Sequence, residues 1–156
     1  MYIVALATAV LFLGLDQLTK YIVVSNMELY ETVPFIKGFM DFTYIHNTGG
    51  AWGILNKYTF ILIIVTAVAL AVCVFCVFKY AKNKLLFFSL CLIISGGLGN
   101  MIDRVFKGGK VIDFLEFKFI EFPIFNIADI AVCIGAGLLM LYFVLDTINE
   151  RKGKKS

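Results

Sequence analysis

The feature that most limits how this chain can fold is a set of four long stretches that are apolar and almost free of charge. They run from Met1 to Leu15, Tyr58 to Phe78, Leu85 to Ile102 and Pro123 to Leu145, and the last contains one charge, Asp129. A helix needs about 20 mostly apolar residues to cross a bilayer. With 61% hydrophobic and 16% charged residues, a chain of 156 residues is too apolar for a soluble core. The stretches therefore predict four membrane-spanning helices.

We expect an all-α membrane protein with a single polytopic domain over residues 1–156 and a small extracytoplasmic β platform. The predicted spans cover about residues 3–24, 58–79, 85–103 and 124–146. The first span has an alternative interpretation as a cleaved signal peptide. It lacks a basic segment before the apolar run, and Asp16 and Lys20 lie where a cleavage site would fall, so a retained helix is favoured.

The two outer segments, about 25–57 and 104–123, carry the signals for the β platform. Residues 41–46 are rich in β-forming side chains and end in Asn47-Thr48-Gly49-Gly50, which is typical of a turn. Residues 115–119 alternate between apolar and charged side chains, which indicates a strand. Strands do not lie exposed to lipid, so we expect both at the outer membrane face, with Trp52 as an interfacial anchor.

Four spans place both termini and the 79–84 loop on one side of the membrane. That side is dense in basic residues, with three in the loop and four in the C-terminal tail: Lys79, Lys82, Lys84, Arg151, Lys152, Lys154 and Lys155. Basic residues favour the cytoplasmic side. We therefore expect cytoplasmic termini, contact of the tail with anionic lipids, and no nucleic-acid partner.

Ionisable side chains inside membrane helices are costly and are functional candidates. Asp16 and Lys20 share one helix face at i and i+4, which also fits a purely structural ion pair. Asn100, Asp103 and Arg104 share another face after three glycines that permit close helix packing. The alternative for this second set is a helix contact with a capping pair.

Four further polar side chains lie near the predicted outer face. Asp113 sits between Ile112 and Phe114, in an apolar setting that raises a carboxyl pKa, although a solvated loop acid is the common case. Asp129 and Asn126 are spaced i, i+3 after Pro123, where a carboxylate also suits a helix N-terminus. Asn47 is either a donor to a backbone carbonyl or a plain turn former.

The residue inventory limits the possible chemistry. His46 is the only histidine and no His-Glu-x-x-His pattern occurs, so a zinc protease is disfavoured and no metal or cofactor is expected. No serine has an elbow context, and a serine–lysine dyad through Lys20 lacks an evident nucleophile. Two aspartates that share a proton can hydrolyse a peptide bond without metal. Spacing leaves open which of Asp16, Asp103, Asp113 and Asp129 pair, and a proton-coupled transporter or a structural assembly factor remains an alternative.

Five short motifs, taken in order, resemble bacterial lipoprotein signal peptidase, also called signal peptidase II. They are Asp16-Gln17-x-Thr19-Lys20, Asn47-x-Gly49, Gly99-Asn100-x-x-Asp103-Arg104, Val111-x-Asp113-Phe114 and Phe125-Asn126-x-Ala128-Asp129. Each motif is weak alone, but the ordered set covers nearly the whole chain. One departure is Gly50, where the family more often has alanine.

The resemblance implies an aspartic endopeptidase of the bacterial inner (cytoplasmic) membrane. Such an enzyme removes the signal peptide from diacylglyceryl-modified prolipoproteins and cleaves before the lipidated cysteine. The motif match assigns catalysis to Asp113 and Asp129, near the outer face of the membrane. It implies that the substrate-binding or supporting residues are Asn47, Asn100, Arg104, Asn126, Asp16, Lys20 and Asp103. We expect a monomer whose partners are this substrate and membrane lipids.

Overall fold

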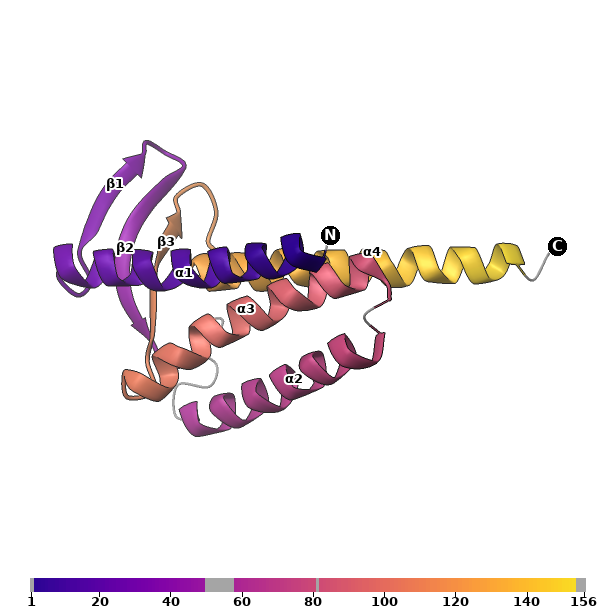
Figure 1. The fold of residues 1–156 in the computed structure, drawn as a ribbon. Helices are drawn as coiled ribbons and strands as arrows, with labels where there is room; N and C mark the ends of the chain where they lie inside the picture. The colour runs from indigo at the N-terminus through magenta and orange to yellow at the C-terminus, as the bar shows by residue number, and fades with distance from the viewer. Residues whose placement is uncertain (1, 50–57, 81, 154–156) are drawn as a thin grey trace.

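The structure is a computed structural model that describes residues 2–49, 58–80 and 82–153. Its elements, in chain order, are the helix α1 (Tyr2–Asn26), the strands β1 (Thr32–Ile36) and β2 (Met40–Asn47), the helices α2 (Thr59–Tyr80) and α3 (Lys84–Phe106), the strand β3 (Val111–Phe117) and the helix α4 (Ile127–Gly153). The helices run lengthwise, and the strands stand across one end of them (Figure 1). The start of α1 and the end of α4 both lie away from the strands.

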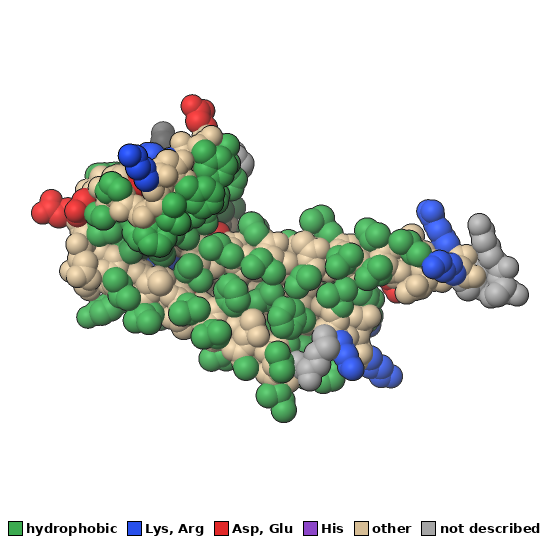
Figure 2. All heavy atoms as spheres, turned by 90° about the horizontal axis from the view of Figure 1, so that it is seen from above, with side chains coloured by type: hydrophobic (Ala, Val, Ile, Leu, Met, Phe, Trp, Pro, Cys, Tyr) green, Lys and Arg blue, Asp and Glu red, His purple; other side chains and the backbone are tan. Residues whose placement is uncertain are grey.

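Four helices in the described part of the chain are long and apolar enough to span a membrane. Their surfaces explain where the excess apolar residues go: α2 contains no buried residue at all. Figure 2 shows hydrophobic side chains along the length of the helices and charged side chains gathered at the two ends. This distribution is what a bilayer requires, because lipid replaces water around the middle of the molecule.

The three strands form one antiparallel sheet in the order β1-β2-β3, with β2 in the centre. The sheet packs on the C-terminal end of α1 through a core of Val23, Tyr44, Ile112, Phe114 and Leu115. The predicted β platform is therefore confirmed. Its first strand was not expected, because β1 is fully exposed and contains Pro34, which an edge strand tolerates.

Three expected boundaries were wrong. The strand β3 ends at Phe117, so the alternation through Phe119 overstated its extent. Asp113 lies buried in the middle of β3, so the apolar setting holds and the alternative of a solvated loop acid does not. The last helix begins at Ile127 instead of about residue 124, because Phe125 exchanges backbone hydrogen bonds with Leu115 of β3. The same helix also runs past residue 146, to Gly153.

Close packing of α3 against α4 and α1 requires small residues. A Cβ atom at Gly96 would collide with the carbonyl oxygen of Ala128, and one at Gly99 would lie 2.6 Å from Asp16 Oδ2. The expected role of the glycines in close helix packing is thus confirmed. Helix α3 is the hub of the bundle, because α1, α2 and α4 all pack against it. The polar end of α3 therefore meets residues from every other helix.

Candidate active site

The start of α4 fixes the position of Asp129. The side chain of Asn126 accepts a hydrogen bond from the backbone N–H of Asp129 (3.0 Å), and Asp129 Oδ2 accepts one from the backbone N–H of Asn126 (3.1 Å). This reciprocal pair is a capping box, which satisfies two backbone donors at a helix N-terminus. The sequence signal of an i, i+3 pair was present, but the two residues meet across a cap and not on a helix face.

The central part of the sheet fixes the position of Asp113. In the β2–β3 register Asp113 lies opposite Ile45, so Asn47 is its diagonal neighbour on the same face. The side chain of Asn47 donates to Asp113 Oδ2 over 2.8 Å, and that of Asn126 donates to Asp113 Oδ1 over 2.6 Å. Of the two alternatives for Asn47, the turn former fits in part, because its Oδ1 accepts from Gly49 N–H, while its amide donates to this carboxylate and not to a backbone carbonyl.

Asn126 joins the two aspartates, and Asn100 completes the set. Asn100 donates to Asp129 Oδ1 over 2.8 Å. Each of the three side-chain oxygens accepts a hydrogen bond. Asn47 Oδ1 accepts from Gly49 N–H, Asn100 Oδ1 from Lys20 Nζ, and Asn126 Oδ1 from Asp129 N–H. These bonds fix which way each amide points, so all three NH₂ groups face the aspartates. Every carboxyl oxygen of the pair thereby receives a hydrogen bond.

Burial changes the acidity of Asp113, whose side chain is 1% exposed. Desolvation first, and the negative charge of Asp129 second, raise the pKa of Asp113 to about 7. The hydrogen bonds from Asn47 and Asn126 act in the opposite direction. A carboxyl with this pKa can hold a proton at neutral pH and donate it.

Both aspartates line a hollow of about 420 Å³ whose remaining walls are mostly apolar. Its apolar lining includes Phe117, Phe122 and Phe125 from the sheet side and Ile130, Cys133 and Ile134 from α4. Of these lining residues, only Phe125 belongs to the motifs singled out in the sequence. The three residues of α4 follow Asp129 at one, four and five positions, a helical spacing that carries them along one face below the acid.

A second cluster lies behind the aspartates and centres on Lys20. Its side chain is fully buried, and Nζ lies 2.9 Å from Asp16 Oδ2, 3.0 Å from Asp103 Oδ2 and 3.0 Å from Asn100 Oδ1. The predicted pairing of Asp16 with Lys20 is thus confirmed. Among the described residues, Lys20 Nζ contacts no serine, and Ser89 and Ser95 donate to backbone carbonyls instead. The basis for a serine–lysine dyad is therefore removed.

The cluster also ties the helices and the sheet together. Asp16 Oδ1 accepts from the backbone N–H of Ala128 at the start of α4 (2.9 Å), and Asp103 Oδ2 accepts from the N–H of Ile112 in β3 (3.2 Å). Gln17 donates to Asp16 Oδ2 and to the carbonyl of Gly99. The residues that precede Asp113 and Asp129 are therefore anchored to the same buried ion cluster.

Arg104 lies at the end of α3 and is 9% exposed. No acceptor among the described residues binds its Nε. With Asn100 and Asp129 it lines a further hollow of about 290 Å³, between α2, α3 and α4. The two hollows therefore meet at Asn100 and Asp129.

The structure brings all nine residues of the predicted site into these connected groups. Trp52, which was expected at the interface, and Gly50, the departure from the family pattern, lie outside the described residues.

The sequence of this chain is similar to a known protein family. A family model described as "Signal peptidase (SPase) II" matches residues 8–145. The protein named lipoprotein signal peptidase of Bacillus pumilus is 43% identical over 141 residues, which cover 88% of this chain and 90% of the relative. The lipoprotein signal peptidase of Listeria monocytogenes is 40% identical, and the match covers 98% of this chain and 96% of the relative. The lipoprotein signal peptidase of Enterococcus faecalis is 37% identical, and the match covers 92% of this chain and 89% of the relative.

Two solved structures share the fold of this chain. A bacterial membrane enzyme determined by the in meso method at 2.3 Å resolution superposes with a TM-score of 0.89 at 36% identity, covering 94% of this chain and 90% of that chain. A second one, at 1.9 Å resolution, superposes with a TM-score of 0.82 at 35% identity, covering 90% and 92%.

Proposed function

Since this chain belongs to the signal peptidase II family of aspartic peptidases, which remove signal peptides from lipoproteins, we propose that Asp113 and Asp129 are the aspartates that hydrolyse the peptide bond. The observation that carries the assignment is the shared donor Asn126, which contacts both carboxyl groups. It holds two acids side by side in one mostly apolar hollow. Two such acids favour a state in which one of them is protonated.

In the proposed reaction Asp113 begins with the proton and Asp129 begins as the carboxylate. Asp129 takes a proton from water as the water oxygen bonds to the scissile carbonyl carbon, and Asp113 gives its proton to the carbonyl oxygen. The tetrahedral intermediate then collapses. Its C–N bond breaks as the amide nitrogen takes the proton from Asp129, and Asp113 recovers its proton from the hydroxyl that re-forms the C=O bond. The products are a carboxylic acid and an amine.

The polar residues around the pair have supporting roles in this proposal. Asn47, Asn100 and Asn126 hold the carboxyl groups in place. Asp16, Lys20 and Asp103 hold Asn100 and the start of α4, because Lys20 binds Asn100 and Asp16 binds Ala128 N–H. Arg104 lines the hollow beside Asp129, its Nε meets no acceptor in the described part of the chain, and it is suited to bind a substrate carbonyl.

The two hollows that meet at Asp129 suit an apolar, lipid-bearing substrate. One is lined by aromatic residues and α4, and the other by α2, α3 and α4. A chain that passes from one to the other lies across Asp129. We infer that they hold the apolar segment of the signal peptide and the acyl chains of a diacylglyceryl-modified prolipoprotein, which is cut before its lipidated cysteine.

The arrangement in the membrane follows from charge. The helix end away from the sheet carries Lys79, Lys84, Arg151 and Lys152, which favours a cytoplasmic location for that end and for both termini. The aspartates then lie near the outer face of the cytoplasmic membrane. We propose a single domain that acts as a monomer in contact with membrane lipids.

The test is cleavage of a diacylglyceryl-modified precursor by purified protein, with the unmodified precursor alongside. We expect Asp113→Asn and Asp129→Asn to remain folded and to lose cleavage by at least about 10³-fold, since each removes one partner of a concerted proton transfer. Asp146→Asn is the matched control, because Asp146 is an exposed aspartate of the same helix α4. Full activity in either dyad variant would show that this pair does not perform the reaction.

A further inference from the structure

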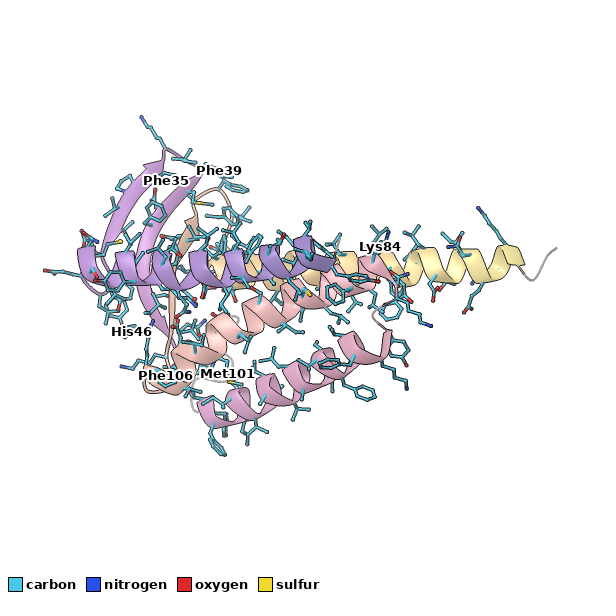
Figure 3. All side chains as sticks on the ribbon, in the orientation of Figure 1. Phe35, Phe39, His46, Lys84, Met101 and Phe106 are labelled. Atoms are coloured by element: carbon cyan, nitrogen blue, oxygen red, sulfur yellow. The ribbon has the colours of Figure 1, made fainter. Side chains whose placement is uncertain are left out.

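A third hollow, of about 550 Å³, shares no lining residue with the two hollows at the aspartates. It is lined by Gln17, Tyr21 and Val24 of α1, Tyr44 and His46 of β2, Lys107 and Lys110 of the α3–β3 turn, and Ile112 of β3. Adjacent strand residues point to opposite faces of a sheet. His46 and Ile112 therefore face away from Asn47 and Asp113, and the hollow lies on the other face of the sheet. His46 sits at the sheet end, toward Phe106 at the end of α3 (Figure 3).

The charge of this hollow is positive. Lys107 and Lys110 line the hollow together with His46, and burial first and then the charges of Lys110 and Lys107 lower the pKa of His46. No Asp or Glu belongs to its described lining. Lys110 forms no ion pair with any residue in the described ranges, whereas Lys107 lies 2.7 Å from Asp103, a buried acid that Lys20 also holds. An uncompensated ammonium therefore faces the hollow.

Hydroxyl and imidazole groups accompany the lysines. The Tyr44 hydroxyl and His46 Nε2 are 2.8 Å apart, and Tyr21 stands at the rim with 69% of its surface exposed. Burial raises the pKa of Tyr44, so its hydroxyl keeps its proton. Ammonium and hydroxyl donors around an open space are the groups that bind phosphate oxygens.

The position of the hollow selects the source of the phosphate. It lies where α1 and α3 end beside the sheet, at the level at which membrane helices meet lipid headgroups. Its rim continues into the exposed apolar surface of α1 at Tyr21 and Val24. The diacylglyceryl group of a lipoprotein contains no phosphate, so the substrate does not account for this chemistry. We propose that the hollow binds the phosphate group of an anionic phospholipid.

Retention of lipids by the purified full-length protein tests the proposal. The protein is equilibrated with mixed micelles of phosphatidylglycerol and phosphatidylcholine, and the bound lipids are counted by native mass spectrometry. We expect one preferred phosphatidylglycerol. Lys110→Gln should lower the preference about fivefold, because a lysine near a lipid surface contributes about 1 kcal/mol to binding. Adding Lys107→Gln should lower it by a smaller further factor, because Lys107 is already paired with Asp103.

The control is Lys37→Gln, which removes an exposed lysine from the β1–β2 turn on the same side of the molecule. It should leave the preference unchanged. Equal losses in Lys37→Gln and Lys110→Gln, or no loss in Lys110→Gln, would overturn the proposal. So would displacement of the lipid by a tenfold excess of inorganic phosphate, which would assign the hollow to a free anion. Lys110→Gln should still cleave lipoprotein precursor at the parental rate in phosphatidylcholine, so this test stands apart from that of the aspartate pair.

Discussion

The buried lysine at the centre of the ion cluster provides the sharpest test of what holds this structure together. Lys20 and Lys107 both lie within 3.0 Å of an oxygen of Asp103, yet Lys20 is 0% exposed and Lys107 is 38% exposed. The two side chains therefore make the same type of contact with one carboxylate in different surroundings. Replacing each by methionine keeps an unbranched side chain of similar shape out to Cε, with sulfur in place of Cδ, and removes the ammonium.

The expected costs differ because burial differs. Lys20→Met leaves Asp16 without its cation and removes one of the two donors to Asn100 Oδ1, the other being Asn126. Loss of one partner from a buried ion pair costs about 3–5 kcal/mol of unfolding free energy. Lys107→Met breaks a partly solvated pair, which is worth at most about 1 kcal/mol. For a chain of this size, the first change corresponds to a fall in Tm of roughly 6–20 °C and the second to a few degrees.

Thermal unfolding of the purified variants in one detergent measures both values. A double variant, Lys20→Met with Asp16→Asn, should recover part of the loss, because it removes a carboxylate that Lys20→Met leaves uncompensated. Equal destabilisation by Lys20→Met and Lys107→Met would contradict the argument from burial. A double variant whose loss of stability equals the sum of the two single losses would also contradict it, because Asp16 and Lys20 would then not be energetically coupled.

Two further predictions concern the acid pair and the helix packing. The pKa of Asp113 is raised from an unfolded value near 4 to about 7, so the folded state binds this proton more tightly than the unfolded state. The free energy of unfolding should therefore fall by up to about 4 kcal/mol as the pH rises between those two values. Asp113→Asn should remove this pH dependence, and unfolding curves from pH 4 to 8 that stay parallel to the parent would refute it. Gly99→Ala should destabilise by about 1–3 kcal/mol, because its Cβ would meet Asp16 Oδ2 at 2.6 Å and Ala128 Cβ at 3.0 Å. Gly137→Ala is the control, because no atom lies within 4 Å of its added Cβ, and it should be neutral or stabilise by up to about 1 kcal/mol. Similar Tm values for the Gly99→Ala and Gly137→Ala variants would argue against tight packing at Gly99.

Hydropathy predicted the helices well because it reports directly whether a segment is suited to lipid or to water. The ends were predicted less well. The start of α4 was placed too early, because Phe125 pairs with Leu115, and no local pattern shows that contact. The end of α4 was placed too early because the residues after Leu145 are polar, although the helix continues beyond the apolar stretch to Gly153.

The sequence by itself determined that the chain spans a membrane four times and carries a set of acids and amides near one end. Composition and motif order are sufficient for this, since they are properties of the chain alone. Only the tertiary structure decided which groups touch. Asp16 meets Ala128 across 112 positions, and Lys20 meets Asn100 across 80. Such contacts depend on how α1, α3 and the start of α4 pack, and that packing gives three ordinary asparagines a fixed orientation toward Asp113 and Asp129.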